Sequence, residues 1–170
     1  DVGTVLQLTA VSNPVNGTVV ISGNNVVFTP NLNFNGAASF QYTVSDGALT
    51  ATGTVNVTVT AVNDAPVAVS DTVTTSEDTV TTIPAATILA NDSDVDGNPL
   101  SITQVSAAQN GTVVLSSGNP VFTPTANFNG TASFQYTISD GSGGTASALV
   151  TLTVTAVNDA PVAVNDTATT

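Results

Sequence analysis

The chain carries one run in which three aspartates alternate with other residues and a glycine closes the run, namely Asp92-Ser93-Asp94-Val95-Asp96-Gly97. No lysine, arginine or histidine occurs anywhere in the chain, so no side chain can neutralise these carboxylates. Like charges two residues apart raise one another's pKa and repel unless a cation joins them. Calcium binds the oxygen atoms of carboxylates, side-chain amides and backbone carbonyls, so the pattern favours a calcium site.

An EF-hand loop begins with the same alternation, but it requires a glutamate at its twelfth position. That position is Thr103 here, which excludes an EF-hand. The alternative to any metal site is a solvated acidic turn, because aspartate, asparagine and glycine are common in turns.

Composition excludes several classes of partner. The chain has 170 residues, a net charge of −12 and 41% hydrophobic residues, which indicates a folded acidic protein. Without basic residues it has no surface for nucleic acid or for anionic lipid. No apolar stretch reaches the roughly 20 residues of a membrane span, so no membrane insertion is expected. The absence of cysteine removes disulfides and thiolate metal sites.

The same composition argues against catalysis. Without histidine, cysteine, lysine or arginine, the chain cannot pair a nucleophile with a base or supply a cation for an oxyanion. A pair of carboxylates, as in glycosidases, is the remaining route, but the acids lie in segments that the metal interpretation already explains. We therefore expect no enzymatic activity.

Internal repeats organise the chain. Residues 61 to 75 match residues 156 to 170 at 13 of 15 positions, an offset of 95, and residues 33 to 47 match residues 127 to 141 equally well at an offset of 94. We therefore expect tandem units of about 95 residues. Residues 1–60 correspond to the C-terminal two thirds of a first repeat, residues 61–155 form a complete repeat, and residues 156–170 are the linker and first strand of a third. On this expectation the first repeat lacks its opening strands.

Alternation of apolar and polar residues predicts strands at residues 54–60, 101–106, 112–116, 121–123, 131–139 and 150–155, with edge strands at 67–75 and 79–83. Residues 84–90 are expected to form one helical turn with Pro84 at its first position. About seven short strands per repeat, joined by Gly, Asn and Pro turns, predict an all-β fold of tandem Greek-key β-sandwich domains. The recurring aromatics are expected in the core; these are Phe28, Phe34, Phe40, Tyr42, Phe122, Phe128, Phe134 and Tyr136.

Five motifs together resemble the cadherin-like tandem repeats of large bacterial calcium-binding surface adhesins. They are Ala-Val-Asn-Asp-Ala-Pro at residues 61–66 and 156–161, Ser-Glu-Asp at 76–78, the acidic run at 90–97, Asn-Phe-Asn-Gly at 127–130 and Tyr-Thr-Ile-Ser-Asp-Gly at 136–141. The resemblance covers the whole chain and implies a cadherin/immunoglobulin-like sandwich, secretion to the cell surface, and Ca²⁺ bound between repeats.

The resemblance also implies the metal ligands. For the junction before the complete repeat they are Asn63, Asp64, Asp92, Asp94 and Asp140, with Asp96 as a further ligand or a turn residue. For the following junction they are Glu77 and Asp159, with Asn158. The chain departs from cadherins in two places, because residues 125–130 contain no acid and Ala65 replaces a common asparagine. We therefore expect one or two ions per complete junction, and we expect Asp71, Asp78 and Asp166 to be solvated surface acids.

The function that follows is a non-enzymatic extracellular structural or adhesive repeat, in which calcium stiffens a rod-like array. Its partners would be neighbouring repeats and a host or cell surface. Two alternatives remain open. One is a repeat subunit of an extracellular filament, in which copies donate strands to each other. The other is a carbohydrate-binding module, against which the absence of tryptophan argues.

Overall fold

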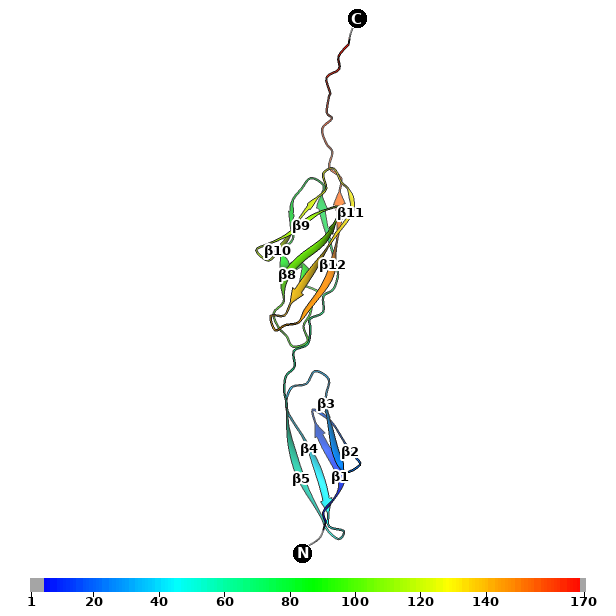
Figure 1. Cartoon of the computed structure of the whole chain (residues 1–170), viewed down its shortest axis with the longest axis vertical. Helices are drawn as coiled ribbons and strands as arrows, with labels where there is room; N and C mark the ends of the chain where they lie inside the picture. The colour runs from blue at the N-terminus through cyan, green and yellow to red at the C-terminus, as the bar shows by residue number, and fades with distance from the viewer. Residues whose placement is uncertain (1–4, 169–170) are drawn as a thin grey trace. The chain divides into compact units, whose positions relative to one another are not determined.

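The computed structural model describes residues 5–168. Its regular structure is 57% strand and 2% helix, which confirms the all-β expectation. The chain forms two compact units, Asp1–Val62 (unit 1) and Asn63–Thr170 (unit 2). Figure 1 labels most of their strands.

Unit 2 is a sandwich of two sheets. One sheet has the order β6-β12-β11-β8 and the other β7-β10-β9. Its elements are β6 (Asp71–Ser76), β7 (Thr81–Thr82), α1 (Ala85–Ile88), β8 (Ser101–Gln109), β9 (Gly111–Ser116), β10 (Asn119–Pro124), β11 (Gly130–Ser139) and β12 (Thr145–Thr155). Neighbouring strands are antiparallel except β6 and β12, which run parallel from Val150 opposite Asp71 to Thr155 opposite Ser76. The chain passes from one sheet to the other at Asn110, whose φ of 58° turns β8 into β9.

The core of unit 2 follows from period-two alternation on the two longest strands. The inward side chains Phe134, Tyr136 and Ile138 of β11 and Val150 and Leu152 of β12 are fully buried, while the residues between them face outward. Phe134 stacks on Phe122 of the opposite sheet with ring centroids 6.1 Å apart. Because the two sheets meet through these side chains, the ends of β11 and β12 are held in fixed positions.

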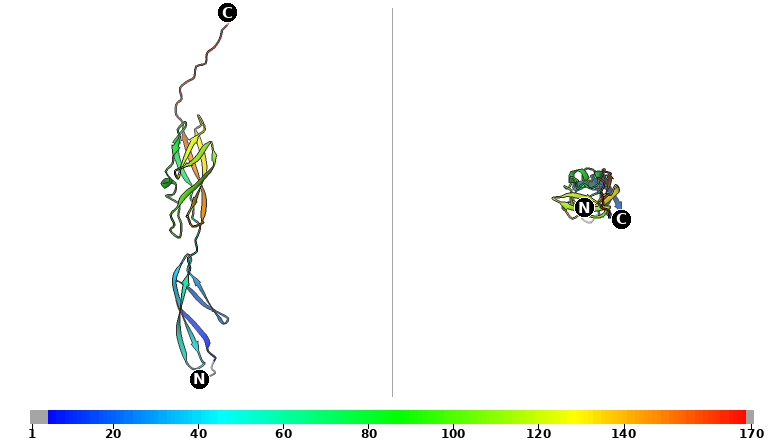
Figure 2. Two further views of the ribbon diagram at one scale, coloured as in Figure 1. Left: turned by 60° about the vertical axis from the view of Figure 1, so that its left-hand side comes forward. Right: turned by 90° about the horizontal axis from the view of Figure 1, so that it is seen from above.

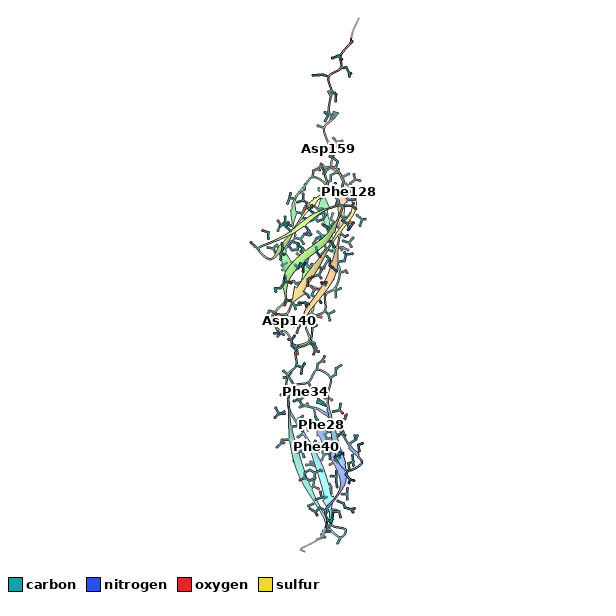
Figure 3. The ribbon with its side chains drawn as sticks, in the orientation of Figure 1. Phe28, Phe34, Phe40, Phe128, Asp140 and Asp159 are labelled. Atoms are coloured by element: carbon teal, nitrogen blue, oxygen red, sulfur yellow. The ribbon has the colours of Figure 1, made fainter. Side chains whose placement is uncertain are left out.

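Unit 1 has fewer strands and a more open core. It consists of β1 (Gln7–Val15), β2 (Gly17–Ser22), β3 (Asn25–Pro30), β4 (Gly36–Ser45) and β5 (Thr50–Val59). These form a sheet of order β1-β4-β5 and a β2-β3 hairpin. The Phe28–Phe40 stack, at 5.9 Å, repeats the Phe122–Phe134 pair, and Figure 3 shows both rings within the unit.

Several boundaries differ from those expected. The predicted edge strands at 67–75 and 79–83 shorten to β6 and β7, and β8 extends to Gln109 because β11 pairs with it as far as Ser133. Pro84 is the N-cap of α1 rather than its first residue.

Burial also differs from the expectation for the aromatics. Phe40, Phe122, Phe134 and Tyr136 are buried. The other four aromatics, which are Phe28, Phe34, Tyr42 and Phe128, are only half-buried. Among the described residues, no helix has both the length and the apolar character needed to cross a membrane.

Candidate metal site

The acidic run lies in the loop between α1 and β8, and backbone hydrogen bonds fix where it begins. Val67 and Ser93 each donate an N–H to the other's carbonyl, at 2.8 and 3.1 Å. This isolated bridge holds the loop against the segment that enters unit 2. Gly97, with φ of 75°, closes the loop in a conformation that favours glycine.

Asp94 organises the loop and leaves one oxygen free. Its Oδ1 accepts the backbone N–H of Asp96 at 2.8 Å and that of Asn98 at 3.3 Å. Its Oδ2 is buried and has no hydrogen-bond partner. A buried carboxylate oxygen without a partner is costly, so this atom is suited to a cation.

Residues from the linker and from the β11–β12 turn lie against the same loop. The Asn63 amide donates to Asp140 Oδ2 at 2.7 Å, and its oxygen accepts from the Asn98 amide at 2.9 Å. The Asp64 backbone N–H donates to Asp96 Oδ2 at 2.8 Å. The linker, the loop and the turn therefore meet at one end of unit 2.

Asp140 is the most buried acid of this end, with 3% of its surface exposed. Its Oδ1 accepts the backbone N–H groups of Ser142 and Gly144, at 2.8 and 2.9 Å. The pKa of Asp140 is lowered, and the largest cause is the hydrogen bond from the Asn63 amide. Burial raises this pKa, but the backbone N–H groups of the turn lower it further, so the net shift is downward. Asp140 therefore remains ionised, as a metal ligand must be.

Asp92 makes a different set of contacts. Its Oδ1 accepts the Val69 N–H at 2.8 Å, and its two oxygens lie 3.0 and 3.2 Å from the Tyr136 hydroxyl. That hydroxyl also lies 2.9 Å from the Val69 carbonyl. These contacts join the loop to the β11 core residue, so Asp92 has a structural role in addition to the ligand role that stays a prediction.

Asp71 lies beside this group and is not the solvated acid expected. It is half-buried, and its Oδ2 is buried without a partner. Burial is the largest cause that raises the pKa of Asp71, and the negative charge of Asp92 raises it further. The pKa of the Tyr136 hydroxyl is also raised, first by burial and then by Asp92.

The ligands expected at the following junction, Glu77 and Asp159, differ from each other in burial and in hydrogen bonding. Glu77 is only 4% exposed, and its Oε1 accepts the Val157 N–H at 2.7 Å. Its own N–H donates to the Thr155 carbonyl at 2.9 Å. Asp159 is exposed two residues further on. Figure 3 places Asp140 and Asp159 at opposite ends of unit 2.

The side chains at the end of unit 2 that contains Asp94 offer the ligand atoms of a calcium site, because these atoms are carboxylate or amide oxygens. In the part of the chain that is described, however, no three acidic side chains are arranged so that they could together hold a metal ion. Hydrogen bonds from Asn63 and from backbone N–H groups instead occupy oxygens of Asp96 and Asp140. An ion would replace some of these bonds, whereas Asp94 Oδ2 has no hydrogen bond to lose.

Sequence reasoning missed two contributors to this end, Asn98 and Ser142. The Asn98 amide also donates to Ser142 Oγ, at 3.3 Å. Asn98 directly follows the Asp-Gly step of the loop, and Ser142 lies in the Asp-Gly turn after β11. Both residues lie two positions after a predicted ligand, Asp96 or Asp140, and this closeness in sequence was the signal that could have identified them.

The fold and this acidic end define a two-sheet β-sandwich of the cadherin and immunoglobulin type. The profile of the cadherin-like domain matches residues 62–155, which is more than half of the chain. The profile of the bacterial Ig domain matches residues 1–58. The chain belongs to the cadherin-like domain family, as the sequence motifs suggested.

One solved structure supports the assignment at the level of the fold. The EC1-2 structure of human mucin-like protocadherin aligns with a TM-score of 0.50 and 22% identity, over 89% of this chain and 84% of that chain. The human desmocollin-1 ectodomain aligns with a TM-score of 0.44 and 14% identity, over 85% of this chain and 32% of that one.

An endo-fucoidan hydrolase of glycoside hydrolase family 107 aligns with a TM-score of 0.37 and 23% identity, over 92% of this chain. The chain spans only 24% of that hydrolase, and a likeness at this score carries no information about activity. None of the curated protein sequences matches the chain.

Proposed function

We propose that the chain is a non-enzymatic, extracellular structural or adhesive repeat that binds Ca²⁺ at the start of unit 2 and is stiffened by it. The observation that carries the proposal is the buried, unpartnered Oδ2 of Asp94, which lies in a loop joined by hydrogen bonds to the linker. Cadherin-like and bacterial Ig domains are typically extracellular and non-enzymatic, which supports the class.

The ligands that we assign to the ion are Asp94, Asp96 and Asp140, with Asn63 and Asp64 from the linker and Asp92 as a further candidate. When bound, calcium supplies the positive charge that a chain without basic residues lacks. Asn63 and Asp64 directly follow Val62, the last residue of unit 1. An ion that holds them against the loop and the turn would reduce the freedom of the linker, which Pro66 already restricts.

Glu77 and Asp159 are the residues that we assign to a second calcium site, at the other end of unit 2. Glu77 already positions the chain there, because its Oε1 accepts the Val157 N–H.

Calorimetric titration of the whole chain with Ca²⁺, together with X-ray scattering in calcium and in chelator, tests the proposal. Extracellular modules of this kind bind calcium with a Kd of about 10⁻⁴ to 10⁻³ M. We expect saturable binding in that range and a narrower distribution of dimensions in calcium. Absence of binding would overturn the metal site, whereas binding with unchanged scattering would overturn only the stiffening.

The carbohydrate-binding alternative gains no support from the surface. Sugar sites commonly use exposed aromatic rings as stacking platforms. Among the described residues, none of the exposed large apolar side chains is aromatic. A glycan array would show selective binding if this alternative were correct.

A further inference from the structure

Strand β9 forms a free edge of the unit 2 sandwich. Within residues 5–168, β9 pairs only with β10, so the side of β9 that faces away from β10 has no partner strand. The edge lies inside residues 62–155, which the cadherin-like profile matches, and Figure 2 shows the hairpin of β9 and β10, in yellow-green, at the side of the sandwich. Such an edge exposes backbone N–H and C=O groups that can pair with another strand.

The β9 edge lacks the features that usually protect a free strand. β9 contains no charged residue and no proline, and its register with β10 has no irregularity. The other sheet ends at β8, which shows two register shifts against β11 and contains Ala107 with a φ of 51°. Irregularities of this kind oppose pairing between edges. β9 is therefore open to a partner strand, whereas β8 is protected.

Unit 1 repeats this contrast. Its β2 has the sequence Gly-Thr-Val-Val-Ile-Ser, and its counterpart β9 has Gly-Thr-Val-Val-Leu-Ser. The register of β2 with β3 is regular, whereas β1 shows two shifts against β4. The outward valines of the two strands, Val20 and Val114, are 55% and 59% exposed. Both units therefore present the same unprotected strand with an exposed valine on it.

The distribution of charge indicates which partner can reach this edge. All 12 charged side chains of the chain are acidic, and none lies between residues 98 and 139, which contain β8, β9, β10 and β11. Asp71 lies on β6, at the opposite edge of the sheet that ends with β8. Two copies of so acidic a chain repel each other in most orientations. The β9 edge is a place where they can approach without bringing carboxylates of their strands together.

The turn between β9 and β10 determines which backbone groups face the free edge. Ser116 and Asn119 lie opposite each other and enclose a two-residue turn, at 117–118, with φ values of 49° and 77°. In such a hairpin the residues that flank the turn exchange hydrogen bonds, and bonded pairs then alternate with non-bonded pairs. Three residues of β9 consequently point their N–H and C=O groups toward the free edge: Gly111, Val113 and Leu115.

Two backbone hydrogen bonds agree with this alternation. The Thr125 N–H donates to the Asn110 carbonyl at 3.0 Å, as expected for a bonded pair one step before Gly111. Pro120, which lies opposite Leu115, has no N–H to donate. Its carbonyl instead accepts the Ile83 N–H at 2.8 Å, on the side away from β9.

We propose that the β9 edges of two copies of the chain pair with each other as antiparallel strands, around a two-fold axis at Val113. This register places Val113 opposite Val113 of the second copy and Gly111 opposite Leu115, so all the edge-facing residues exchange backbone hydrogen bonds. Thr112 then lies opposite Val114 of the second copy on the outer face, and the exposed valine gains a cross-strand neighbour. The β7-β10-β9 sheets of the two copies form one continuous sheet.

Neighbouring registers form fewer hydrogen bonds. An axis at Val114 would place Gly111 opposite Ser117 in the turn, so the bonded pair of Gly111 with Leu115 is lost. The contact uses the same surface of both copies, and such an isologous contact closes between two molecules. None of the residues that we assign to calcium lies in β9, so the pairing goes beyond the proposed function and does not depend on the ion.

Disulfide trapping between whole chains tests the pairing, since the chain has no native cysteine. Chains with Thr112→Cys are mixed with chains with Val114→Cys under mild oxidation, in chelator and at about 0.15 M salt, where the Debye length is about 8 Å. Opposed residues of a non-bonded antiparallel pair have Cα atoms about 4.5 Å apart, which a disulfide can span. The matched control replaces Val114→Cys with Ser116→Cys, another exposed position on the outer face of β9.

We expect the disulfide between the two different chains, identified by its mass, to form roughly tenfold faster for Thr112→Cys with Val114→Cys than for the control pair. The reason is that pairing raises the local concentration of opposed thiols. Equal rates, or a faster control, would overturn the proposal. The expected cross-link is the same whether a calcium titration is positive or negative.

A second comparison removes the central edge-facing N–H. Val113→Pro is added to both cysteine chains, and the matched chains carry Val113→Ala, which also shortens the side chain but keeps the N–H. Proline is tolerated where the N–H of an edge strand points away from its sheet. We expect Val113→Pro to lower the rate to that of the control pair and Val113→Ala to leave it largely unchanged. Equal rates in folded proline and alanine variants, as judged by circular dichroism, would overturn backbone pairing at this edge.

Discussion

At the scale of single residues, Asp94 combines two roles in one carboxylate. Its Oδ1 closes the loop by accepting two backbone N–H groups, while Oδ2 remains buried and unpartnered. Asparagine at this position keeps an oxygen for the two N–H groups and removes the charge. The loop can therefore keep its backbone conformation while its affinity for a cation changes.

We expect Asp94→Asn to weaken calcium binding at least about tenfold, which corresponds to roughly 1.4 kcal/mol. The matched control is Asp78→Asn, which removes the same charge from an exposed acid that accepts the Asn127 N–H. Calorimetric titration of both whole-chain variants measures the effect. Equal affinities in the two variants would show that net charge, rather than the loop, attracts calcium.

Asp71 is a residue whose charge opposes folding. Burial and the nearby Asp92 raise its pKa above the ordinary value of 3.8, so the folded state binds a proton more readily than the unfolded state. The free energy of unfolding should therefore rise as pH falls through the raised pKa, and level off below the ordinary value.

Asp71→Asn should increase the free energy of unfolding at pH 7 by up to about 1 kcal/mol, since it removes a partly buried charge that lacks a full set of partners. The gain should shrink as pH falls, because wild-type Asp71 then becomes neutral too. Denaturant unfolding of whole chains in chelator between pH 7 and 4 measures this. The control is Asp166→Asn, which removes the same charge from the exposed repeat counterpart of Asp71. An equal increase in the free energy of unfolding in this control would show that the burial of Asp71 is not the cause.

At the scale of elements, much of the sandwich could be predicted from the sequence, because period-two alternation on β11 and β12 is a local pattern. Other features depend on contacts between distant segments. The contact between Asp92 and Tyr136 joins residues 44 positions apart, and no spacing rule brings them together. Likewise, the burial of Asp71 depends on how β6 lies against β12. The loop chemistry was therefore predictable, but the orientation of each carboxylate was not.

Tyr136 joins β11 to the acidic loop through its hydroxyl. Tyr136→Phe keeps the buried ring and leaves the Asp92 carboxylate and the Val69 carbonyl without this donor. We expect a loss of about 1–3 kcal/mol in the free energy of unfolding of unit 2. Tyr42→Phe, at the repeat counterpart in unit 1, is the control, because among the described residues no hydrogen bond from its hydroxyl is present. Comparable losses in both variants would mean that the Asp92 contact contributes nothing.

At the scale of the whole molecule, the two units should respond differently to calcium. The proposed ligands Asn63, Asp64, Asp94, Asp96 and Asp140 all belong to unit 2. In the described residues, unit 1 has fewer strands than unit 2 and a more open core, so it should unfold at the lower temperature. Calorimetry of the whole chain should therefore show two transitions.

Ligand binding to the folded state stabilises it by about 1.4 kcal/mol per site when calcium exceeds its Kd tenfold. For a domain of roughly 100 residues, this raises Tm by several degrees, about 4–8 °C. We expect only the upper transition to shift when chelator is replaced by millimolar Ca²⁺, with Mg²⁺ at the same concentration as the control for ionic strength. A shift of both transitions, or an equal shift in Mg²⁺, would indicate general screening of the net charge of −12 instead of bound calcium.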